Sequence, residues 1–433
     1  MPKKIVEICN QIIEYSFYLL AIVVPLVLTP KNYELFEYNK MMTVYAMTVV
    51  IFGAWAVKMI VLKKAELKKS PFDVFLILFL ISQILSTLFS LDVHTSIWGY
   101  YSRFHGGLLS SISYCLLYFA FTNNINSLRV LKNLLYAVLS TAFVVAVYGI
   151  LEHFGIDKNL WVQDVQNRVF STLGQPNWLG AYMAVVLPIA MGVLFYKIIN
   201  NTCHPELGFT ESDSVSGSSN FKNKMPKPNI VPRSGTTMGA QVRHDKLIGY
   251  WALFIGKLGI VHWSLVVLSI IFYITLLFTK SRSGVLGFWT ADIIFGLLLF
   301  FNPATVKAKF ASFKQAFKLF LILNSCFLLL SFIIGGSGLW VFEKFSWPVL
   351  TKQTVKQESI DLTKSKPTCE SVIATGVTES GEIRRIVWKG ALNVFANNPI
   401  FGSGVETFAY AYYRFRPVEH NMTSEWDFLY NKA

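Results

Sequence analysis

Four arginine residues at or beyond the ends of apolar stretches could bind a phosphate group. They are Arg103, Arg168, Arg282 and Arg384. A guanidinium group is planar and always charged, and it can bind two phosphate oxygens at once. Several of these groups converging at one membrane surface would suit a lipid-linked diphosphate. The alternative, for each arginine taken singly, is that it only reaches from a helix end to the lipid headgroups.

Two other ionisable residues could take part in chemistry. His420, beside Glu419, could act as a general base toward a hydroxyl group, and the alternative is an ordinary exposed loop histidine. Asp292 lies within an apolar stretch, where a carboxylate is costly. Asp292 is therefore either functional or paired with a neighbouring helix.

The sequence lacks the patterns that hold a metal ion. It contains no Asp-x-Asp, and no His, Cys and carboxylate cluster has metal-ligand spacing. The five cysteines are scattered and outline no disulfide framework. We therefore predict no metal and no cofactor. A diphosphate whose charge is neutralised by arginines is already a good leaving group.

The elements that must position these residues are membrane spans. The chain is 53% hydrophobic and only 15% charged, which predicts an all-α polytopic membrane protein with about nine transmembrane helices and a partly helical extracytoplasmic loop. The nine predicted spans are Ile12–Thr29, Met41–Leu62, Phe72–Phe89, Gly107–Phe121, Leu134–Phe154, Trp178–Ile198, Leu258–Phe278, Val285–Phe301 and Phe317–Val341.

The distribution of basic residues predicts the orientation of these spans. With the N-terminus in the cytoplasm, the short inner segments carry twelve Lys and Arg residues and the short outer loops carry seven. The net charge of +14 is therefore attributed to the membrane and not to nucleic acid. The predicted organisation is six transmembrane helices in 1–199, a cytoplasmic low-complexity loop in 200–257, three further helices in 258–342 and an extracytoplasmic loop in 343–433.

The outer loop is predicted to contain an amphipathic helix that ends at Asn398-Pro399. Arg384 and Trp388 are four residues apart and should share one face of this helix. We expect the helix to lie along the outer membrane surface with its apolar stripe toward the lipid. The stripe consists of Ile383, Ile386, Val387, Ala391, Val394 and Phe395.

Taken together, four motifs resemble those of the bacterial O-antigen ligase and polymerase family of membrane glycosyltransferases. They occur in the same order, all on the predicted outer side, and the similarity runs from about Phe72 to the end. The motifs are Ile97-Trp-Gly99 with Arg103, Arg168 with Ser171-Thr-Leu-Gly-Gln-Pro-Asn177, Thr279-Lys-Ser-Arg-Ser-Gly284, and Arg384-Arg-Ile-Val-Trp388 with Asn398-Pro-Ile-Phe-Gly-Ser-Gly404.

The resemblance implies an enzyme of lipopolysaccharide or polysaccharide biosynthesis in the bacterial cytoplasmic (inner) membrane. It would transfer a glycan from a polyprenyl-diphosphate carrier such as undecaprenyl diphosphate to a hydroxyl of a glycan, lipid or protein acceptor, without a metal and with inversion. Arg168, Arg282 and Arg384 match the arginines that bind the donor diphosphate in the family, and Arg103 is a further candidate. The remaining partner is membrane lipid, and no nucleic acid is expected.

The resemblance also predicts residues beyond the end of the given chain. In the family, the outer loop continues through Ala-His-Asn, whose histidine is the base, and then into further spans. This chain stops at Ala433 just before that point. We therefore expect a C-terminally truncated, inactive sequence whose catalytic base is missing, with His420 as a weak candidate within it.

A rival interpretation is a transporter or flippase of a lipid-linked glycan, which also needs outer arginines. That class predicts broken helices in two related halves, and the sequence shows no such internal repeat. A structural membrane scaffold, with arginines that only contact headgroups, is the remaining alternative.

Overall fold

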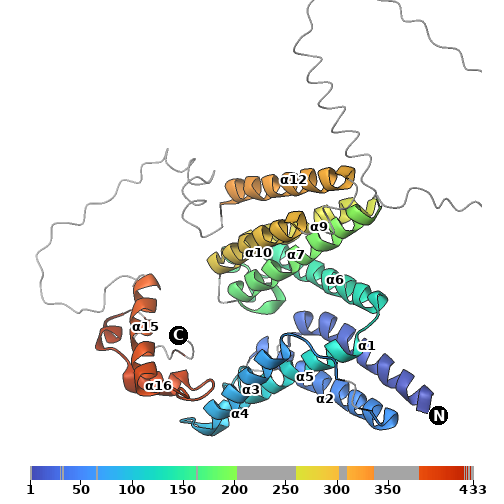
Figure 1. The fold of residues 1–433 in the computed structure, drawn as a ribbon. Coiled ribbons are helices and arrows are strands. Elements are labelled where there is room, and N and C mark those ends of the chain that lie inside the picture. The colour runs from blue at the N-terminus through green and yellow to red at the C-terminus, as the bar shows by residue number, and fades with distance from the viewer. Residues whose placement is uncertain are drawn as a thin grey trace, which may run out of the picture. The chain divides into compact units, whose positions relative to one another are not determined.

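A computed structural model describes most of the helical parts of the chain (Figure 1). The described residues are 2–29, 31, 34–64, 67–161, 164–201, 260–301, 310–335, 380–423, 425, 427 and 430. The predicted low-complexity loop and the first part of the predicted outer loop lie outside these residues. The chain divides into two compact units, one of 1–186, 271–287 and 330–433 and the other of 187–270 and 288–329.

All regular structure in the described residues is helical, as predicted. The long helices are α1 (Pro2–Leu26), α2 (Glu37–Leu62), α3 (Asp73–Leu88), α5 (Leu108–Asn124), α6 (Leu128–His153), α7 (Pro176–Asn201), α9 (Ile260–Phe278), α10 (Arg282–Phe301), α12 (Phe310–Ile334) and α15 (Ser380–Asn397). The short ones are α4 (Val93–Trp98), η1 (Ser171–Leu173), α16 (Phe408–Phe415) and η2 (Val418–Met422).

Each of the nine predicted spans overlaps one of these helices, although parts of Leu258–Phe278 and Phe317–Val341 lie outside the described residues. Within the described part of the chain, α1, α2, α6, α7, α10 and α12 are long and apolar enough to cross a membrane. Helices α3 and α9 are apolar but shorter, and α5 has 17 residues. Six spans are therefore supported, and the number nine stays a prediction.

The first helices of the larger unit pack around a shared apolar core. Helix α1 lies against α2 and α6, and α2 lies against α5 (Figure 1). Their contact is made by buried Ile13 and Phe17 of α1, Ile51 and Trp55 of α2, and Ala120 of α5. Burial of such side chains stabilises the helix pairs and leaves their other faces for the lipid.

A second core forms where the loop before α2 meets the loop before α7. Phe36 packs against Phe170 and Trp161, with ring centroids 5.8 and 5.5 Å apart. Gly174 has φ +81°, and a Cβ atom there would lie 2.4 Å from the Phe36 ring. Only glycine suits this position, because it alone combines that backbone conformation with so close an approach.

The smaller unit is held together by aromatic rings. Phe295 of α10 packs against Phe195 and Phe320, with centroids 5.7 and 6.4 Å apart. Asp292, also on α10, is 3% exposed and is hydrogen-bonded to Asn324 of α12. Of the two alternatives stated for Asp292, a functional role or pairing with a neighbouring helix, the structure shows the pairing.

Helix α15 forms in the predicted outer loop and ends at Asn397, next to the predicted Asn398-Pro399 stop. Its buried Ile383 and Val387 pack against Tyr412 of α16. The expectation that these residues of the stripe face lipid was wrong, because they form a small protein core instead.

Candidate functional site

Arg168 lies on the loop before α7 and reaches the turn between α9 and α10. Its Nε atom donates to the carbonyl oxygen of Thr279 at 3.3 Å, and its Nη2 atom donates to Oδ1 of Asn177 at 3.4 Å. The backbone nearby is also joined, since the N–H of Val169 donates to the carbonyl of Phe278 at 3.3 Å. The structure thus brings together two motifs that are more than a hundred residues apart in the sequence.

Arg282 is the first residue of α10 and follows this turn directly. Ser281 Oγ donates to Oδ1 of Asn177 at 3.1 Å, the same atom that accepts from Arg168. Lys280 donates from Nζ to Oδ1 of Asn167, which places a third cation beside the two arginines. Asn177 therefore ties the turn that carries Arg282 to the start of α7.

Helices α7 and α10 approach each other closely at their N-termini. A Cβ atom on Gly284 would lie 3.0 Å from the Cα and carbonyl carbon of Gly180, and one on Gly180 would lie 2.8 Å from Cβ of Ser281. The small residues let the two N-terminal ends, each carrying partial positive charge, lie side by side. An anion at this place would be favoured by both helix ends as well as by the arginines.

Both arginines of this pair are available to an anion. Arg168 and Arg282 are exposed. Among the described residues, neither guanidinium group forms an ion pair with a carboxylate. Unpaired neighbouring cations repel each other, so a bound dianion would relieve that repulsion.

Glu152, buried at the end of α6, fixes the backbone next to Arg168. Its Oε2 atom accepts hydrogen bonds from the N–H groups of Phe170 and Ser171, both at 2.8 Å. Ser171 has φ +52°, a conformation that is uncommon for a residue with a side chain, and its Oγ donates to the carbonyl of Val145 at 2.7 Å. The carboxylate thus holds an unusual turn that the backbone alone would not adopt.

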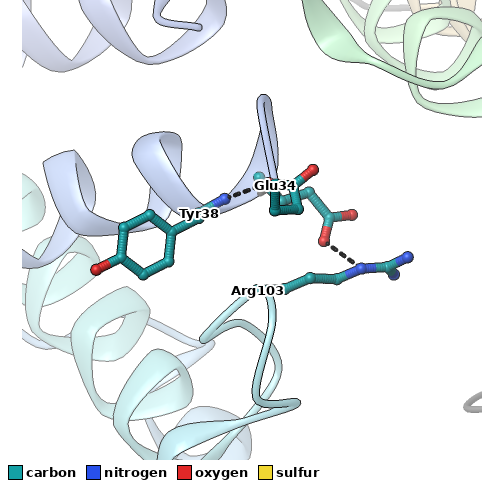
Figure 2. Close-up of polar contacts among 4 residues, drawn as sticks. Glu34, Tyr38 and Arg103 are labelled. Carbon is teal, nitrogen blue, oxygen red and sulfur yellow. Dashed lines mark hydrogen bonds and ion pairs between the residues drawn. The ribbon is translucent and has the colours of Figure 1, made fainter. Parts of the chain in front are cut away.

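Arg103 forms no described contact with this pair and is itself paired with a carboxylate. Its Nε atom is 3.1 Å from Oε2 of Glu37, at the start of α2. Figure 2 shows this ion pair next to Glu34, whose Oε2 accepts from the N–H of Tyr38 at 2.7 Å. Glu37 neutralises Arg103, so this arginine is less suited to bind diphosphate than Arg168 or Arg282.

A cavity of about 330 Å³ opens beside Glu37. Its polar lining comes from Glu37, Lys40 and His105, and its aromatic lining from Tyr114 and Trp178. Trp178 follows Asn177 directly, so the cavity adjoins the segment that contacts Arg168. Aromatic faces together with a carboxylate and an ammonium group are suited to a polar ring with hydroxyl groups.

Arg384 lies on the exposed side of α15. Its charge acts on Tyr430: burial raises the pKa of Tyr430 above its ordinary value, and the Arg384 charge offsets a small part of that increase. No described contact joins Arg384 to Arg168 or Arg282. The structure therefore brings Arg168 to the turn that carries Arg282, and a donor site that also includes Arg384 stays a prediction.

The segment after α15 docks onto the loop before α4. The N–H of Leu91 donates to the carbonyl of Ser403 at 2.9 Å, and Ser96 Oγ donates to the carbonyl of Val405 at 2.8 Å. Gly404 has φ +115°, and a Cβ atom there would lie 2.1 Å from Oγ of Ser90. The glycine-rich motif thus serves close backbone packing and contacts the residues that directly precede the Ile97-Trp-Gly99 motif.

His420 is fully buried, so the expectation of an exposed loop histidine was wrong. Its Nδ1 atom is 2.6 Å from the Tyr412 hydroxyl, and its Nε2 atom is 3.2 Å from the carbonyl oxygen of Glu425. Since a carbonyl only accepts, Nε2 carries the proton and Nδ1 accepts from the tyrosine. Burial lowers the pKa of His420, and with both nitrogens engaged it is poorly placed to act as a base.

Among the described residues, no group of three or more His, Cys, Asp and Glu side chains could hold a metal ion. The polar groups at the Arg168–Arg282 pair are arginine, lysine, serine and asparagine side chains. This set favours an anionic ligand.

The comparison with protein families bears on this geometry. Residues 265–428 match the family described as O-antigen ligase. The match confirms the resemblance to O-antigen ligases that the sequence motifs indicated. No curated protein and no solved structure matches the chain.

The matched residues 265–428 include Arg282, Arg384 and His420, whereas Arg103 and Arg168 precede them. The hydrogen bond from Arg168 to Thr279 joins Arg168 to the matched residues. Together with the apolar helices, the family match indicates a multi-pass membrane protein.

Sequence reasoning missed two residues of the site. No role is predicted for Glu152 from the sequence, although a glutamate closing an apolar run is itself a signal of buried hydrogen bonding. Asn177 was quoted within a motif without a role. In the structure it accepts from both Arg168 and Ser281.

Proposed function

We propose that this chain is a membrane glycosyltransferase of the O-antigen ligase type. It transfers a glycan from a polyprenyl-diphosphate carrier to an acceptor hydroxyl on the outer face of the bacterial cytoplasmic membrane. The observation that carries the proposal is the pair of exposed arginines formed by Arg168, on the loop before α7, and Arg282, at the N-terminus of α10, neither of which pairs with a described carboxylate. The family match to residues 265–428 supports the same reaction class.

The arginine pair would bind the diphosphate of the donor. Charge on the diphosphate increases as its bond to the sugar breaks, so cations already in place stabilise the transition state more than the ground state. Lys280, held beside them through Asn167, adds a third positive charge. In this proposal the arginines supply the charge neutralisation, and the reaction is independent of a metal.

The chemical step is a single displacement. The acceptor oxygen forms a bond to the anomeric carbon while the bond from that carbon to the diphosphate oxygen breaks. The polyprenyl diphosphate leaves with the bonding electron pair, and a base takes the hydroxyl proton. Attack from the side opposite the leaving group inverts the configuration at the anomeric carbon. No described residue is assigned as the base.

The cavity beside Glu37 would receive a sugar ring. Trp178 and Tyr114 offer aromatic faces to the C–H surface of a pyranose, and Glu37 and Lys40 offer an acceptor and a donor for its hydroxyls. Its place next to Asn177 would put a sugar near the arginine pair. This cavity is the candidate for the part of the glycan closest to the diphosphate.

A transfer assay in detergent tests the proposal. Protein expressed from its complete reading frame is purified and mixed with a polyprenyl-diphosphate glycan and an acceptor. We expect a covalent glycan–acceptor product and release of the polyprenyl diphosphate. Transfer without a bilayer excludes a pure transporter. Donor binding without any product, for every acceptor class offered, would contradict the proposal that the chain is a glycosyltransferase.

A further inference from the structure

Helix α15 carries two apolar faces, of which only one is used inside the protein. The inner face consists of the buried side chains of Ile383, Val387 and Val394. The close contact at Gly390 completes it, because a Cβ atom there would lie 2.4 Å from the ring of Tyr412. With this face already packed, the helix needs no further apolar residues to stay folded.

The second face nevertheless presents three large apolar side chains. Trp388, Leu392 and Phe395 are 61%, 67% and 62% exposed. Their spacing of four and three residues places them in one stripe, on the side of the helix opposite the packed face. A contiguous apolar stripe of this size on a polar loop indicates a surface that is covered by something apolar.

The charges around this stripe suit a lipid surface. Arg384 and Arg385 lie about one turn before Trp388. Around the helix axis they point to opposite edges of the stripe, so a cation lies near the start of the stripe on each side. Both arginines are exposed, and no described carboxylate pairs with them. The third cation of the helix, Lys389, is 2.6 Å from Glu419 and is thereby neutralised. Apolar residues that include Trp, flanked by arginines, are typical of helices that lie in the membrane interface.

The stripe also continues toward an apolar helix. Ile400 follows it at 82% exposure, and the ring of Phe401 stacks on Phe89, with centroids 4.5 Å apart. Phe89 directly follows α3, whose residues Leu88 and Phe75 are exposed apolar side chains. The stripe thus extends to the end of an apolar helix, which is where a membrane surface is expected.

We propose that α15 is an interfacial helix whose Trp388, Leu392 and Phe395 enter the boundary between headgroups and acyl chains of the bilayer. Arg384 and Arg385 then lie at the depth of the lipid phosphates. The inference holds whether or not the chain transfers a glycan. If it does, the same placement presents Arg384 to a carrier whose diphosphate lies at that depth.

Photo-crosslinking in lipid nanodiscs tests the placement. Benzoylphenylalanine is introduced in place of Phe395 or Trp388, which keeps an aromatic ring at each exposed position. Asn393 is the matched control, because it is exposed on the same helix but lies outside the stripe. The nanodiscs contain phosphatidylcholine and phosphatidylglycerol in equal amounts, and adducts are identified by mass spectrometry.

We expect lipid adducts at positions 395 and 388, several-fold above those at 393. Replacing Arg384 and Arg385 together by Gln should lower the phosphatidylglycerol adducts more than the phosphatidylcholine adducts. Crosslinks from 395 and 388 to another segment of this chain or to a second copy would overturn the proposal, as would equal lipid labelling at all three positions.

Discussion

Arg168 donates from Nε to the carbonyl oxygen of Thr279, three residues before Arg282, at 3.3 Å. The contact joins the loop that precedes α7 to the turn that precedes α10. Because Arg168 and Ser281 also share Asn177 as acceptor, the two guanidinium groups are carried by segments that are hydrogen-bonded to one another. A diphosphate binding there would meet a preformed pair.

Loss of either arginine of the pair should weaken binding of the donor carrier. Hydrogen bonds to charged groups contribute about 1.5–3 kcal/mol, so Arg282→Ala and Arg168→Ala should each weaken undecaprenyl diphosphate binding roughly ten- to a hundredfold. Arg282→Lys should lose less, since it keeps the charge but not the bidentate geometry. Binding is measured on purified protein in detergent.

The control for these variants is Arg129→Ala, an exposed arginine at the start of α6 on the predicted cytoplasmic side. It should bind the carrier as the unaltered protein does. Binding within about twofold of normal for both Arg282→Ala and Arg168→Ala would remove the basis for the proposed donor site.

Glu152 should act through the hydrogen bonds that it accepts. Glu152→Ala leaves the buried N–H groups of Phe170 and Ser171 without an acceptor, at about 1–3 kcal/mol each. We expect a lower thermal unfolding midpoint and weaker carrier binding. Glu152→Gln keeps an acceptor oxygen and should retain most of the thermal stability and most of the carrier binding. Equal losses of stability and binding in Glu152→Ala and Glu152→Gln would show that the negative charge of Glu152 matters, and not its hydrogen bonds.

The contact between Gly284 and Gly180 should tolerate no added carbon. Gly284→Ala places a Cβ atom 3.0 Å from backbone atoms, which cannot move aside as a side chain can. Overpacking of this kind costs about 1–3 kcal/mol. Thermal unfolding in detergent is compared with Gly53→Ala, where nothing lies within 4 Å and the substitution should be neutral or slightly stabilising.

His420 should make the stability of the C-terminal helices depend on pH. Burial lowers its pKa in the folded state below the ordinary value of about 6.5. As the pH falls below that value, the unfolded chain takes up a proton that the folded chain does not, so stability decreases. Above the ordinary pKa, His420 is neutral in both the folded and the unfolded state, and its effect on stability disappears.

This dependence is measured by thermal unfolding or hydrogen exchange of the region around α16 between pH 7.5 and 5. His420→Gln should flatten the profile, whereas His94→Gln, which alters an exposed histidine, should leave it unchanged. An unaltered slope in His420→Gln would assign the acid sensitivity to other groups.

The predicted orientation has a direct test in reporter fusions. Alkaline phosphatase is active only outside the cytoplasm, so a fusion after Gly155, between α6 and α7, should be active. A fusion after Asn126, between α5 and α6, should be inactive. The reverse pattern would place the arginine pair on the cytoplasmic side and contradict the proposed site.

The helices were largely predictable because apolar length and periodicity are local properties of the sequence. The stop at Asn398-Pro399 followed from the chemistry of one dipeptide. What the sequence did not reveal is which partner covers a given face. Ile383 and Val387 were expected against lipid, and the structure packs them against Tyr412, a choice that depends on a contact between separate helices.

The candidate site was predictable in its residue types but not in its grouping. Arg168 and Arg282 are brought together by hydrogen bonds to a carbonyl and to Asn177, and no local pattern encodes such bonds. Arg103 matched the same motif set, yet Glu37 neutralises it. Glu37 lies far from Arg103 in the sequence, so only the three-dimensional structure could separate this arginine from the other two.

The docking of Ser96 on Val405 joins positions 309 residues apart. During synthesis, the ribosome completes every long helix from α1 to α12 before the residues that cover α4 exist. The loop around α4 must therefore remain without its partner until Val405 has been synthesised. The contact between α4 and Val405 can therefore form only after all the helices from α1 to α12 have been synthesised.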